Sequence, residues 1–260
     1  MTRTLVTGGT VVLGRELVPR LLAAGHTVRI MSRRSGASNA AGDVEWAQAD
    51  LEKGTGLVEA VAGVETIVHC ASDPFGNTKE ADVEGTRRLL EAAKASGVGH
   101  VYYISIVGIE KISYPYYKSK VATEQVIESA GVPFTILRAT QFHPLLDTFL
   151  ETLMRRGPFL LLPGSMKYQL IDVGEVADHM VKTLSNGPSG RLPDIGGPKV
   201  QSAKEIARAW LKASDRKLIR IPVPAAGPLS GFAKGYSCCP DNIFGKITWE
   251  EWLRKTYGDR

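Results

Sequence analysis

The 260-residue sequence predicts an α/β fold, in which a doubly wound parallel sheet carries a smaller carboxyl-terminal lobe. Two observations predict it. Short apolar stretches alternate with segments of helical periodicity as far as Leu150, an alternation that is typical of βαβ units. Beyond that residue, prolines separate shorter elements. We therefore expect a main domain over residues 1–150 and, over residues 151–260, a lobe that does not fold by itself.

The composition limits the classes of protein to which the chain can belong. It is 43% hydrophobic and 23% charged, which is ordinary for a globular protein. The net charge is +5, but the Lys and Arg residues are scattered and do not alternate with aromatic residues, so we expect no nucleic-acid partner. No apolar stretch reaches the roughly 18 residues of a membrane helix, and little sequence precedes the first expected strand. We expect a cytoplasmic protein without a membrane partner, and nothing in the sequence requires more than a monomer.

The first expected element is a strand from Thr4 that runs into a glycine-rich turn and a helix start at Gly14. In a nucleotide-binding turn of this kind, the second glycine lets the backbone approach a pyrophosphate, but here that position falls on Val11. A β-branched residue disfavours positive φ and places methyl groups where a phosphate oxygen would seek an N–H group, so the affinity for the cofactor is an open question. We still expect the cofactor to contact this turn through Thr7, Gly8, Gly9, Thr10, Val11, Val12, Leu13 and Gly14.

The expected helix ends at Gly25, and a second strand over residues 27–31 leads into Ser32, Arg33 and Arg34. At the end of this strand, a protein that binds NAD usually has an acidic residue that contacts the ribose. A guanidinium group matches a 2′-phosphate instead, so Arg33 and Arg34 predict NADP(H). The alternative is that both arginines are ordinary solvated surface charges.

A third strand over residues 44–48 is followed by Asp50 and Leu51, which are expected to meet an adenine. An equally good interpretation is that Asp50 caps the helix over residues 56–61. The fourth strand begins at Thr66 and ends in the small residues Cys70, Ala71 and Ser72, which would suit a flat ligand. His69 lies inside that strand, and we interpret it as a structural residue.

A helix over residues 79–96 and a strand over residues 100–104 place Ser105 at a strand's carboxyl end, the edge where such sheets bind ligands. The next helix begins near Tyr114. It carries Tyr116 and Lys120 four residues apart, so they share a face, and the ammonium can lower the pKa of the phenol and bind a ribose hydroxyl. Tyr114 and Lys118 repeat the same spacing, so this second frame stays open.

A sixth strand over residues 134–138 leads into a loop that is expected to flank the nicotinamide through Ala139, Thr140 and Phe142. His143, in the same loop, supplies a proton or forms a hydrogen bond with a loop carbonyl.

In the lobe we expect helices over 173–184 and 202–211, a cover over a pocket at 222–242, and a terminal helix that begins at Thr248 and docks its aromatic residues. The three cysteines, Cys70, Cys238 and Cys239, lack the spacing of a zinc site, so we expect unpaired thiols.

Several motifs together resemble one family. They are Thr7-Gly8-Gly9-Thr10 with Gly14, the Arg33-Arg34 pair, Ser105, the segment from Tyr116 to Lys120, and the segment from Phe134 to Thr140. Over nearly the whole chain the sequence resembles the atypical short-chain dehydrogenase/reductase family, in its NmrA-like, NAD(P)-binding branch. The resemblance implies a Rossmann domain that binds NADP(H), with a small-molecule substrate between the main domain and the lobe. Val11 departs from the family pattern, which has glycine there.

The branch contains reductases as well as regulators that bind the nucleotide without chemistry, so three functions are weighed. The first is an NADPH-dependent reductase of a small carbonyl, quinone or enone, in which Ser105 polarises the substrate oxygen, Tyr116 donates a proton and Lys120 orients the ribose. The second is an NADP(H)-sensing regulatory protein. The third is a non-redox enzyme of a biosynthetic intermediate, with Tyr116 or His143 as acid or base and with weakened or lost cofactor binding.

Overall fold

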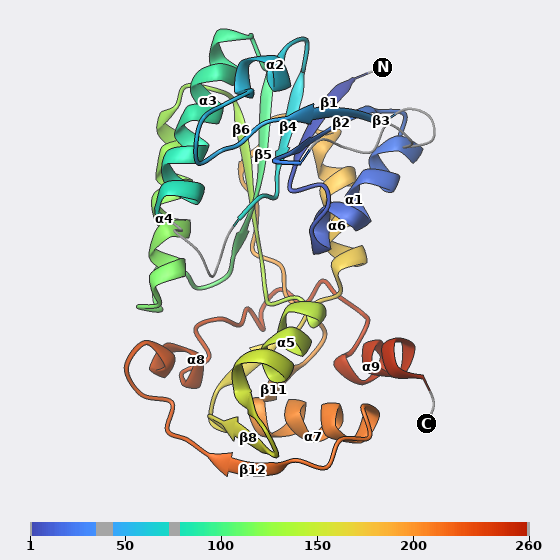
Figure 1. Cartoon of the computed structure of the whole chain (residues 1–260), viewed down its shortest axis with the longest axis vertical. Helices are drawn as coiled ribbons and strands as arrows, with labels where there is room; N and C mark the ends of the chain where they lie inside the picture. The colour runs from blue at the N-terminus through green and yellow to red at the C-terminus, as the bar shows by residue number, and fades with distance from the viewer. Residues whose placement is uncertain (1, 35–43, 73–78, 259–260) are drawn as a thin grey trace. The chain divides into compact units, whose positions relative to one another are not determined.

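The structure is a computed structural model that describes residues 2–34, 44–72 and 79–258 (Figure 1). The chain forms two compact units that alternate along the sequence. The sheet unit comprises Met1–Ser105, Lys118–Leu137 and Ala177–Leu192, and the lobe unit comprises Ile106–Tyr117, Arg138–Val176 and Pro193–Arg260. This division differs from the single boundary that we expected at residue 150, because the chain returns to the sheet unit after residue 176.

The sheet unit is built on a seven-stranded parallel sheet with the order β10-β6-β5-β4-β1-β2-β3. Its strands are β1 (Arg3–Thr7), β2 (Thr27–Ser32), β3 (Val44–Gln48), β4 (Thr66–His69), β5 (His100–Ile106), β6 (Phe134–Ala139) and β10 (Gly190–Arg191). The order reverses between β1 and β4, and such a reversal is where open α/β sheets bind ligands. The predicted doubly wound parallel sheet is therefore confirmed.

Helices cover both faces of this sheet (Figure 1). On one face, α2 (Leu57–Val61), α3 (Gly85–Ala95) and α4 (Pro115–Ser129) share an apolar core with alternate residues of the strands. On the other face lie α1 (Val12–Ala23) and α6 (Val173–Leu184), which an ion pair between Arg20 and Asp178 joins. The alternation of side chains along β5 shows the same division, because Tyr102 bonds Thr183 of α6 whereas Tyr103 belongs to the core beneath α3 and α4.

The expected helix over residues 79–96 is two elements, a π-helix over Lys79–Glu84 (η1) and then α3. The reason lies in the carbonyl of Asp82, which accepts hydrogen bonds from the hydroxyls of Thr86 (2.5 Å) and Thr123 (3.2 Å). Hydroxyls that bond a helix carbonyl compete with the regular backbone bonds and widen the turn. Because Thr123 lies on another helix, the helical periodicity of this segment does not reveal the change.

The lobe unit contains two small sheets and short helices. The three-stranded sheet has the order β12-β8-β7, and β11 pairs with β9. The elements of the lobe unit are α5 (His143–Phe149), η2 (Leu150–Met154), β7 (Arg155–Arg156), β8 (Phe159–Leu162), β9 (Lys167–Gln169), β11 (Val200–Ser202), α7 (Ala203–Ala213), β12 (Ile219–Pro222), η3 (Gly227–Leu229), α8 (Ser230–Ala233) and α9 (Trp249–Tyr257). The role of residues 222–242 as a cover stays a prediction.

Both α7 and α9 begin at a capping residue, as was expected for Thr248. Ser202 and Thr248 each form a capping box with the glutamate three residues later, which satisfies two backbone N–H groups at each helix start. Trp249 is buried, and its indole N–H donates to the carbonyl of Ile206 on α7 at 3.1 Å. The predicted docking of the terminal aromatic residues is confirmed.

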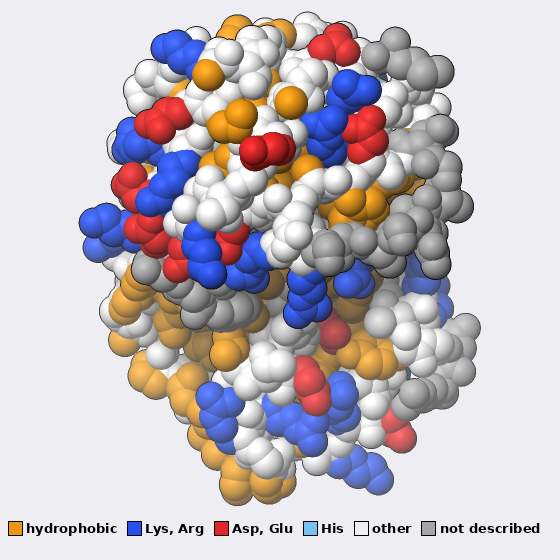
Figure 2. Space-filling view, turned by 45° about the horizontal axis from the view of Figure 1, so that its top comes forward, with side chains coloured by type: hydrophobic (Ala, Val, Ile, Leu, Met, Phe, Trp, Pro, Cys, Tyr) orange, Lys and Arg blue, Asp and Glu red, His pale blue; other side chains and the backbone are white. Residues whose placement is uncertain are grey.

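The surface of the described residues shows no large block of one charge on the face in Figure 2, where Lys and Arg side chains are interspersed with Asp and Glu. All three cysteines lie in the described segments and are free. Within those segments, the search for membrane spans finds no helix with the length and hydrophobicity that a bilayer crossing needs.

Candidate functional site

The glycine turn after β1 is closed by contacts that only glycine permits. Gly8 has φ +68°, and a Cβ there would lie 2.8 Å from the backbone nitrogen of Ala71, at the end of β4. A Cβ on Gly14 would collide with the carbonyl oxygen of Gly8. The first and third glycines therefore do what the motif requires: one makes the bend at the switch point, and the other lets α1 pack against the turn.

Val11 does not carry the backbone conflict that its sequence position suggested. Its φ is −87° and its ψ is 177°, an extended conformation that valine adopts readily, because the positive φ of the turn falls on Gly8. The Val11 side chain is 44% exposed. The expectation of strain at this residue is thus wrong in its backbone part, while the position of the methyl groups relative to a phosphate stays a prediction.

The amino-terminal end of α1 has the chemistry of an anion site. Val11 occupies the N-cap and, within the described residues, provides no side-chain hydrogen bond to the helix. The N–H groups of Val12, Leu13 and Gly14 have no carbonyl four residues earlier in the helix, and the first turn holds no acidic side chain. Free N–H groups and the positive end of the helix dipole both favour a phosphate, so the turn fits the pyrophosphate of a dinucleotide.

Arg33 and Arg34 follow β2 directly and are exposed. The parallel register pairs Thr7 with Met31, so both arginines leave the sheet at the same edge as the glycine turn. Side chains hold the backbone here, since the carbonyl of Arg33 accepts from the side-chain amide of Gln48 at 3.3 Å and the Arg34 N–H donates to the Ser32 hydroxyl at 3.2 Å. Among the described residues, no ion pair occupies either guanidinium group.

The Asp50 carboxylate caps a turn, but not the helix that we considered. It accepts from the N–H groups of Glu52 (2.9 Å) and Lys53 (3.3 Å). The helix α2 begins later, and its N-cap is Gly56 in the left-handed region. Leu51 is half-buried beside Asp50, at the carboxyl end of β3. Contact of either residue with an adenine stays a prediction.

The end of β4 meets the glycine turn through the backbone. The N–H of Cys70 donates to the carbonyl of Thr7 (3.2 Å), and the N–H of Ala71 donates to the Thr7 hydroxyl (3.1 Å). Burial raises the pKa of the Cys70 thiol to about 12, so this thiol stays protonated. Ser72 donates its hydroxyl proton to the buried carboxylate of Asp82 at 2.7 Å.

His69 is buried and satisfied, which confirms its structural interpretation. Its Nδ1 lies 2.6 Å from the Thr7 hydroxyl and its Nε2 lies 2.9 Å from the Thr86 hydroxyl. The Thr86 hydroxyl donates to the carbonyl of Asp82, so it accepts from Nε2–H, and Thr7 donates to Nδ1. The ring is therefore neutral, in agreement with its pKa, which burial lowers to about 3.

Ser105 and Lys120 lie near the carboxyl end of β5, and both are buried. The Ser105 hydroxyl has no hydrogen-bond partner among the residues that the structure describes. The Lys120 ammonium donates to the hydroxyl of Tyr103 (2.9 Å) and, at 3.4 Å, to the carbonyl of Ile104. An unpaired buried hydroxyl costs free energy, so Ser105 is placed to bond a group that the described residues do not provide.

The start of α4 distinguishes the two Tyr–Lys frames. The helix begins at Pro115, so Tyr116 lies inside it and Tyr114 precedes it. Lys118 is exposed, whereas Lys120 is only 4% exposed and hydrogen-bonded. The helix register therefore favours the pair of Tyr116 and Lys120.

The loop after β6 lies in the lobe unit and is tied down by main-chain bonds. Thr140 is buried, its N–H donates to the carbonyl of Ile195 (3.0 Å), and its hydroxyl accepts from Gly197 (3.3 Å). Ala139 is also buried, and Phe142 is half-buried at the N-cap of α5. Ala139 is the last residue of β6 rather than part of the loop, and contact of the three residues with a nicotinamide stays a prediction.

His143 is completely buried in the lobe unit. Its ring stacks on Trp249 and Trp252, with 5.8 Å between the centroids in each case, and its Nδ1 lies 4.0 Å from the Asp172 carboxylate. Within the described part of the chain, neither ring nitrogen has a hydrogen bond, so the expected bond to a loop carbonyl is not formed. The nearby His143 ring holds the pKa of the Asp172 carboxylate below its usual range, and the backbone N–H groups of Glu175 and Gly174 add to this effect. Contact of the His143 ring with a substrate stays a prediction.

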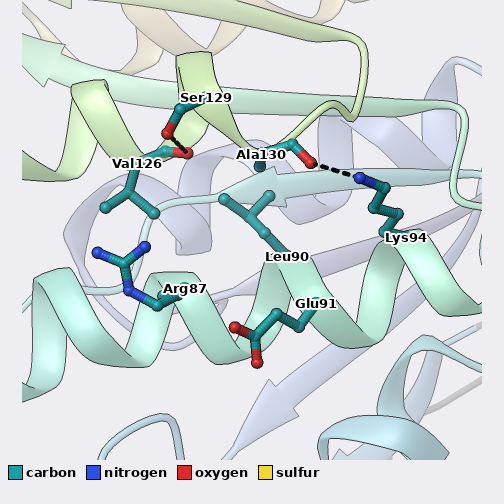
Figure 3. Close-up of a pocket in the computed structure, with 7 residues that line it drawn as sticks. All are labelled: Arg87, Leu90, Glu91, Lys94, Val126, Ser129 and Ala130. Atoms are coloured by element: carbon teal, nitrogen blue, oxygen red, sulfur yellow. Dashed lines mark hydrogen bonds between the residues drawn. The ribbon is translucent and has the colours of Figure 1, made fainter.

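The described residues also contain a cavity between α3 and α4, with a volume of about 230 Å³ (Figure 3). It is lined by Arg87, Leu90, Glu91, Lys94, Val126, Ser129 and Ala130. Apolar side chains form part of the wall, and Lys94 donates to the carbonyl of Ala130 at 3.3 Å. None of the predicted site residues lines this cavity, so it is no part of the candidate site.

Within the sheet unit, the parallel strands thus bring the glycine turn, Arg33, Ser72 and Ser105 to one edge. Sequence reasoning did not predict the contact of Tyr103, whose hydroxyl accepts a hydrogen bond from the Lys120 ammonium. The signal that could have found it is the alternation along β5, because Tyr103 stands two residues before Ser105 and therefore on the same face of the strand.

Comparisons with known proteins agree with this geometry. A family profile described as NAD(P)H-binding matches residues 8–186. A reductase of (4-alkanoyl-5-oxo-2,5-dihydrofuran-3-yl)methyl phosphate from Streptomyces griseus is 30% identical over 205 residues, which cover 77% of this chain and 70% of that protein. The photosystem II assembly factor Ycf39 of Cyanophora paradoxa is 25% identical over 268 residues, covering 97% of this chain and 81% of its own.

Among solved structures, the NADPH-dependent quinone oxidoreductase QOR2 of Escherichia coli, in complex with NADPH, superposes with a TM-score of 0.78. The likeness covers 98% of this chain and 99% of that one, at 18% identity. At this identity the superposition shows the fold alone, and it agrees with the resemblance to short-chain dehydrogenases/reductases.

Proposed function

Because the chain belongs to the NAD(P)H-binding family, we propose that it is an NADPH-dependent reductase of a small carbonyl, quinone or enone. The observation that carries the proposal is the pair of buried polar groups near the end of β5. Ser105 keeps a buried hydroxyl without a partner among the described residues, and Lys120 keeps a buried ammonium. A buried hydroxyl without a partner costs stability unless a ligand uses it, and a protein that only binds a nucleotide has no need of such a serine there.

The chain's own residues divide the work as follows. The N–H groups at the start of α1 hold the pyrophosphate, and Arg33 and Arg34 take the 2′-phosphate. Lys120 binds a ribose hydroxyl. When bound, the reduced nicotinamide supplies a hydride.

Two groups act on the substrate oxygen. Ser105 donates a hydrogen bond to it, and Tyr116 gives it a proton. Lys120 follows Tyr116 by four residues on α4, so both side chains belong to one face of that helix. We assign the proton to Tyr116 because it shares α4 with Lys120, whereas the His143 ring is stacked on Trp249 and Trp252.

One relative supports the redox assignment, since the Streptomyces griseus protein is named as a reductase. The likeness to Ycf39, named as an assembly factor, favours a second candidate, in which the chain binds the nucleotide and regulates a partner without turnover.

A titration with NADPH, followed by a panel of quinones, carbonyls and enones, separates these functions. We expect saturable binding and oxidation of NADPH with at least one class of substrate. Tight binding without turnover across the panel would favour the regulatory function. If NADPH does not bind at all, the reductase proposal is wrong and the non-redox enzyme becomes the better one.

A further inference from the structure

Three residues of the sheet unit form a row across adjacent strands beneath the candidate site. The register pairs Thr7 of β1 with His69 of β4, and His69 with Tyr103 of β5. Their side chains are in contact, because Thr7 bonds the His69 ring, which stacks on Tyr103 with 5.4 Å between the centroids. Thr7 directly precedes the glycine turn, so the row links that turn to β5.

The far end of the row is a phenol that accepts a hydrogen bond from a buried cation. The Tyr103 hydroxyl lies 2.9 Å from Nζ of Lys120, and both residues are almost completely buried. A lysine side chain has four rotatable bonds, so an ammonium that must meet a ribose hydroxyl loses entropy unless the protein fixes it beforehand. The phenol provides such a fixed acceptor without a competing negative charge.

The middle of the row, His69, is held by hydrogen bonds on both ring nitrogens. The hydroxyls of Thr7 and Thr86 determine its tautomer, and the neutral ring can stack on Tyr103 close to a cation without repelling that cation. The positive charge of Lys120 further lowers the pKa of His69, which places both groups in one electrostatic environment. A protonated imidazole here would repel the Lys120 ammonium electrostatically. The neutral ring of His69 avoids this repulsion.

We propose that Tyr103 is a positioning residue of the reductase site, whose hydroxyl fixes the Lys120 ammonium near the carboxyl end of β5 while His69 fixes the Tyr103 ring. The inference rests on the proposed function, because it assigns Lys120 to the nucleotide. It makes Tyr103 act through Lys120 and without contact to the substrate.

Tyr103→Phe tests the proposal, and Tyr102→Phe is its matched control. Both tyrosines are buried on β5, but Tyr102 points to the opposite face and bonds Thr183 at 2.8 Å. Each substitution keeps the ring and removes one buried hydroxyl, so we expect similar losses of thermal stability. Only Tyr103→Phe should weaken the binding of NADPH, by about tenfold, the scale of one hydrogen bond to a charged group. Equal NADPH affinities in the two variants would overturn the proposal.

Two further measurements separate positioning from packing. In a Lys120→Met background, Tyr103→Phe should change NADPH affinity by less than about twofold, because the residue through which it acts is gone. If the full loss persists there, Tyr103 acts by another route. In active protein, Tyr103→Phe should raise the KM for NADPH while Tyr102→Phe leaves it nearly unchanged, because a less firmly held ammonium binds the ribose less well.

The last measurement does not depend on the reductase function. The apoprotein is acetylated with an N-hydroxysuccinimide ester, and the rate at Lys120 is followed by peptide mass spectrometry. We expect Lys120 to react at least about threefold faster in Tyr103→Phe than in the parent or in Tyr102→Phe, because a lysine that lacks its acceptor is less ordered. If the parent binds no NADPH, the reductase proposal fails, and unchanged labelling would still refute the hold of Tyr103 on Lys120.

Discussion

Val11 stands where a turn with three glycines has its second glycine. Since its backbone is extended and its side chain is 44% exposed, a glycine at this position has no strain to relieve. We expect Val11→Gly to change the dissociation constant of NADPH by less than about threefold in a fluorescence titration. Gly14→Ala is the contrasting variant, and it should abolish tight binding because its Cβ collides with the Gly8 carbonyl. A gain of about tenfold in Val11→Gly would show that the methyl groups crowd the pyrophosphate.

Arg33 and Arg34 are the residues that select the cofactor in our proposal. Both are exposed, so replacing them with alanine should leave the thermal stability nearly unchanged. The double variant should bind NADPH about 10- to 100-fold more weakly, the scale of one or two charge-assisted hydrogen bonds. Binding of NADH, which lacks the 2′-phosphate, is the internal control and should not change. A variant that still prefers NADPH as strongly as the parent would show that another group reads this phosphate.

Among the elements, the junction of β1, β4 and α3 depends on a neutral His69. Burial lowers the pKa of His69 to about 3, against about 6.5 for an unfolded chain. Between these values the unfolded chain binds a proton that the folded protein does not bind. This contribution to stability is therefore complete above about pH 6.5 and is lost as the pH falls towards 3, by about 1.4 kcal/mol per pH unit.

Urea unfolding at several pH values between 7 and 4 measures this dependence. His69→Gln should destabilise the protein at pH 7 and should flatten the slope by about 1.4 kcal/mol per pH unit. His100→Gln is a parallel test on β5, because burial lowers the pKa of His100 to about 4 and its contribution to the slope has the same sign. Should His69→Gln keep the slope of the parent, the His69 ring already carries a proton in the native protein.

How far the sequence predicts an element depends on where its determinants lie. Strands β1 to β6 and α1 were predicted because apolar spacing and a glycine stop are local signals. The π-helix before α3 was missed because Thr123, which bonds its carbonyl, lies on α4. The surroundings of His143 were missed for the same reason, since Trp249 and Trp252 are about a hundred residues away. The edge of the candidate site was predictable because parallel strands must all end there, but the acceptor of Lys120 was not.

At the scale of the whole molecule, the path of the chain determines which pieces can fold. Residues 177–192 return to the sheet unit after the chain has entered the lobe unit. There β10 pairs with β6, and Arg191 lies 2.8 Å from the carboxylate of Glu124, whose side chain is 1% exposed. A buried carboxylate that loses such a partner is strongly destabilising, typically by about 3–5 kcal/mol. The sequence did not reveal this return, because the pairing joins residues that lie more than fifty positions apart.

A chain that ends at residue 150 should therefore not fold cooperatively, although it contains every expected nucleotide-binding residue. It lacks α6 and β10, so Tyr102 loses Thr183, β6 becomes an open edge and Glu124 loses Arg191. Circular dichroism of this fragment should show no sharp thermal transition, and NADPH should not bind to it. Arg191→Ala in the full chain isolates the ionic part and should lower the melting temperature while leaving one cooperative transition. A fragment that melts sharply and binds NADPH as the full chain does would show that residues 1–150 fold independently, as a single boundary there would require.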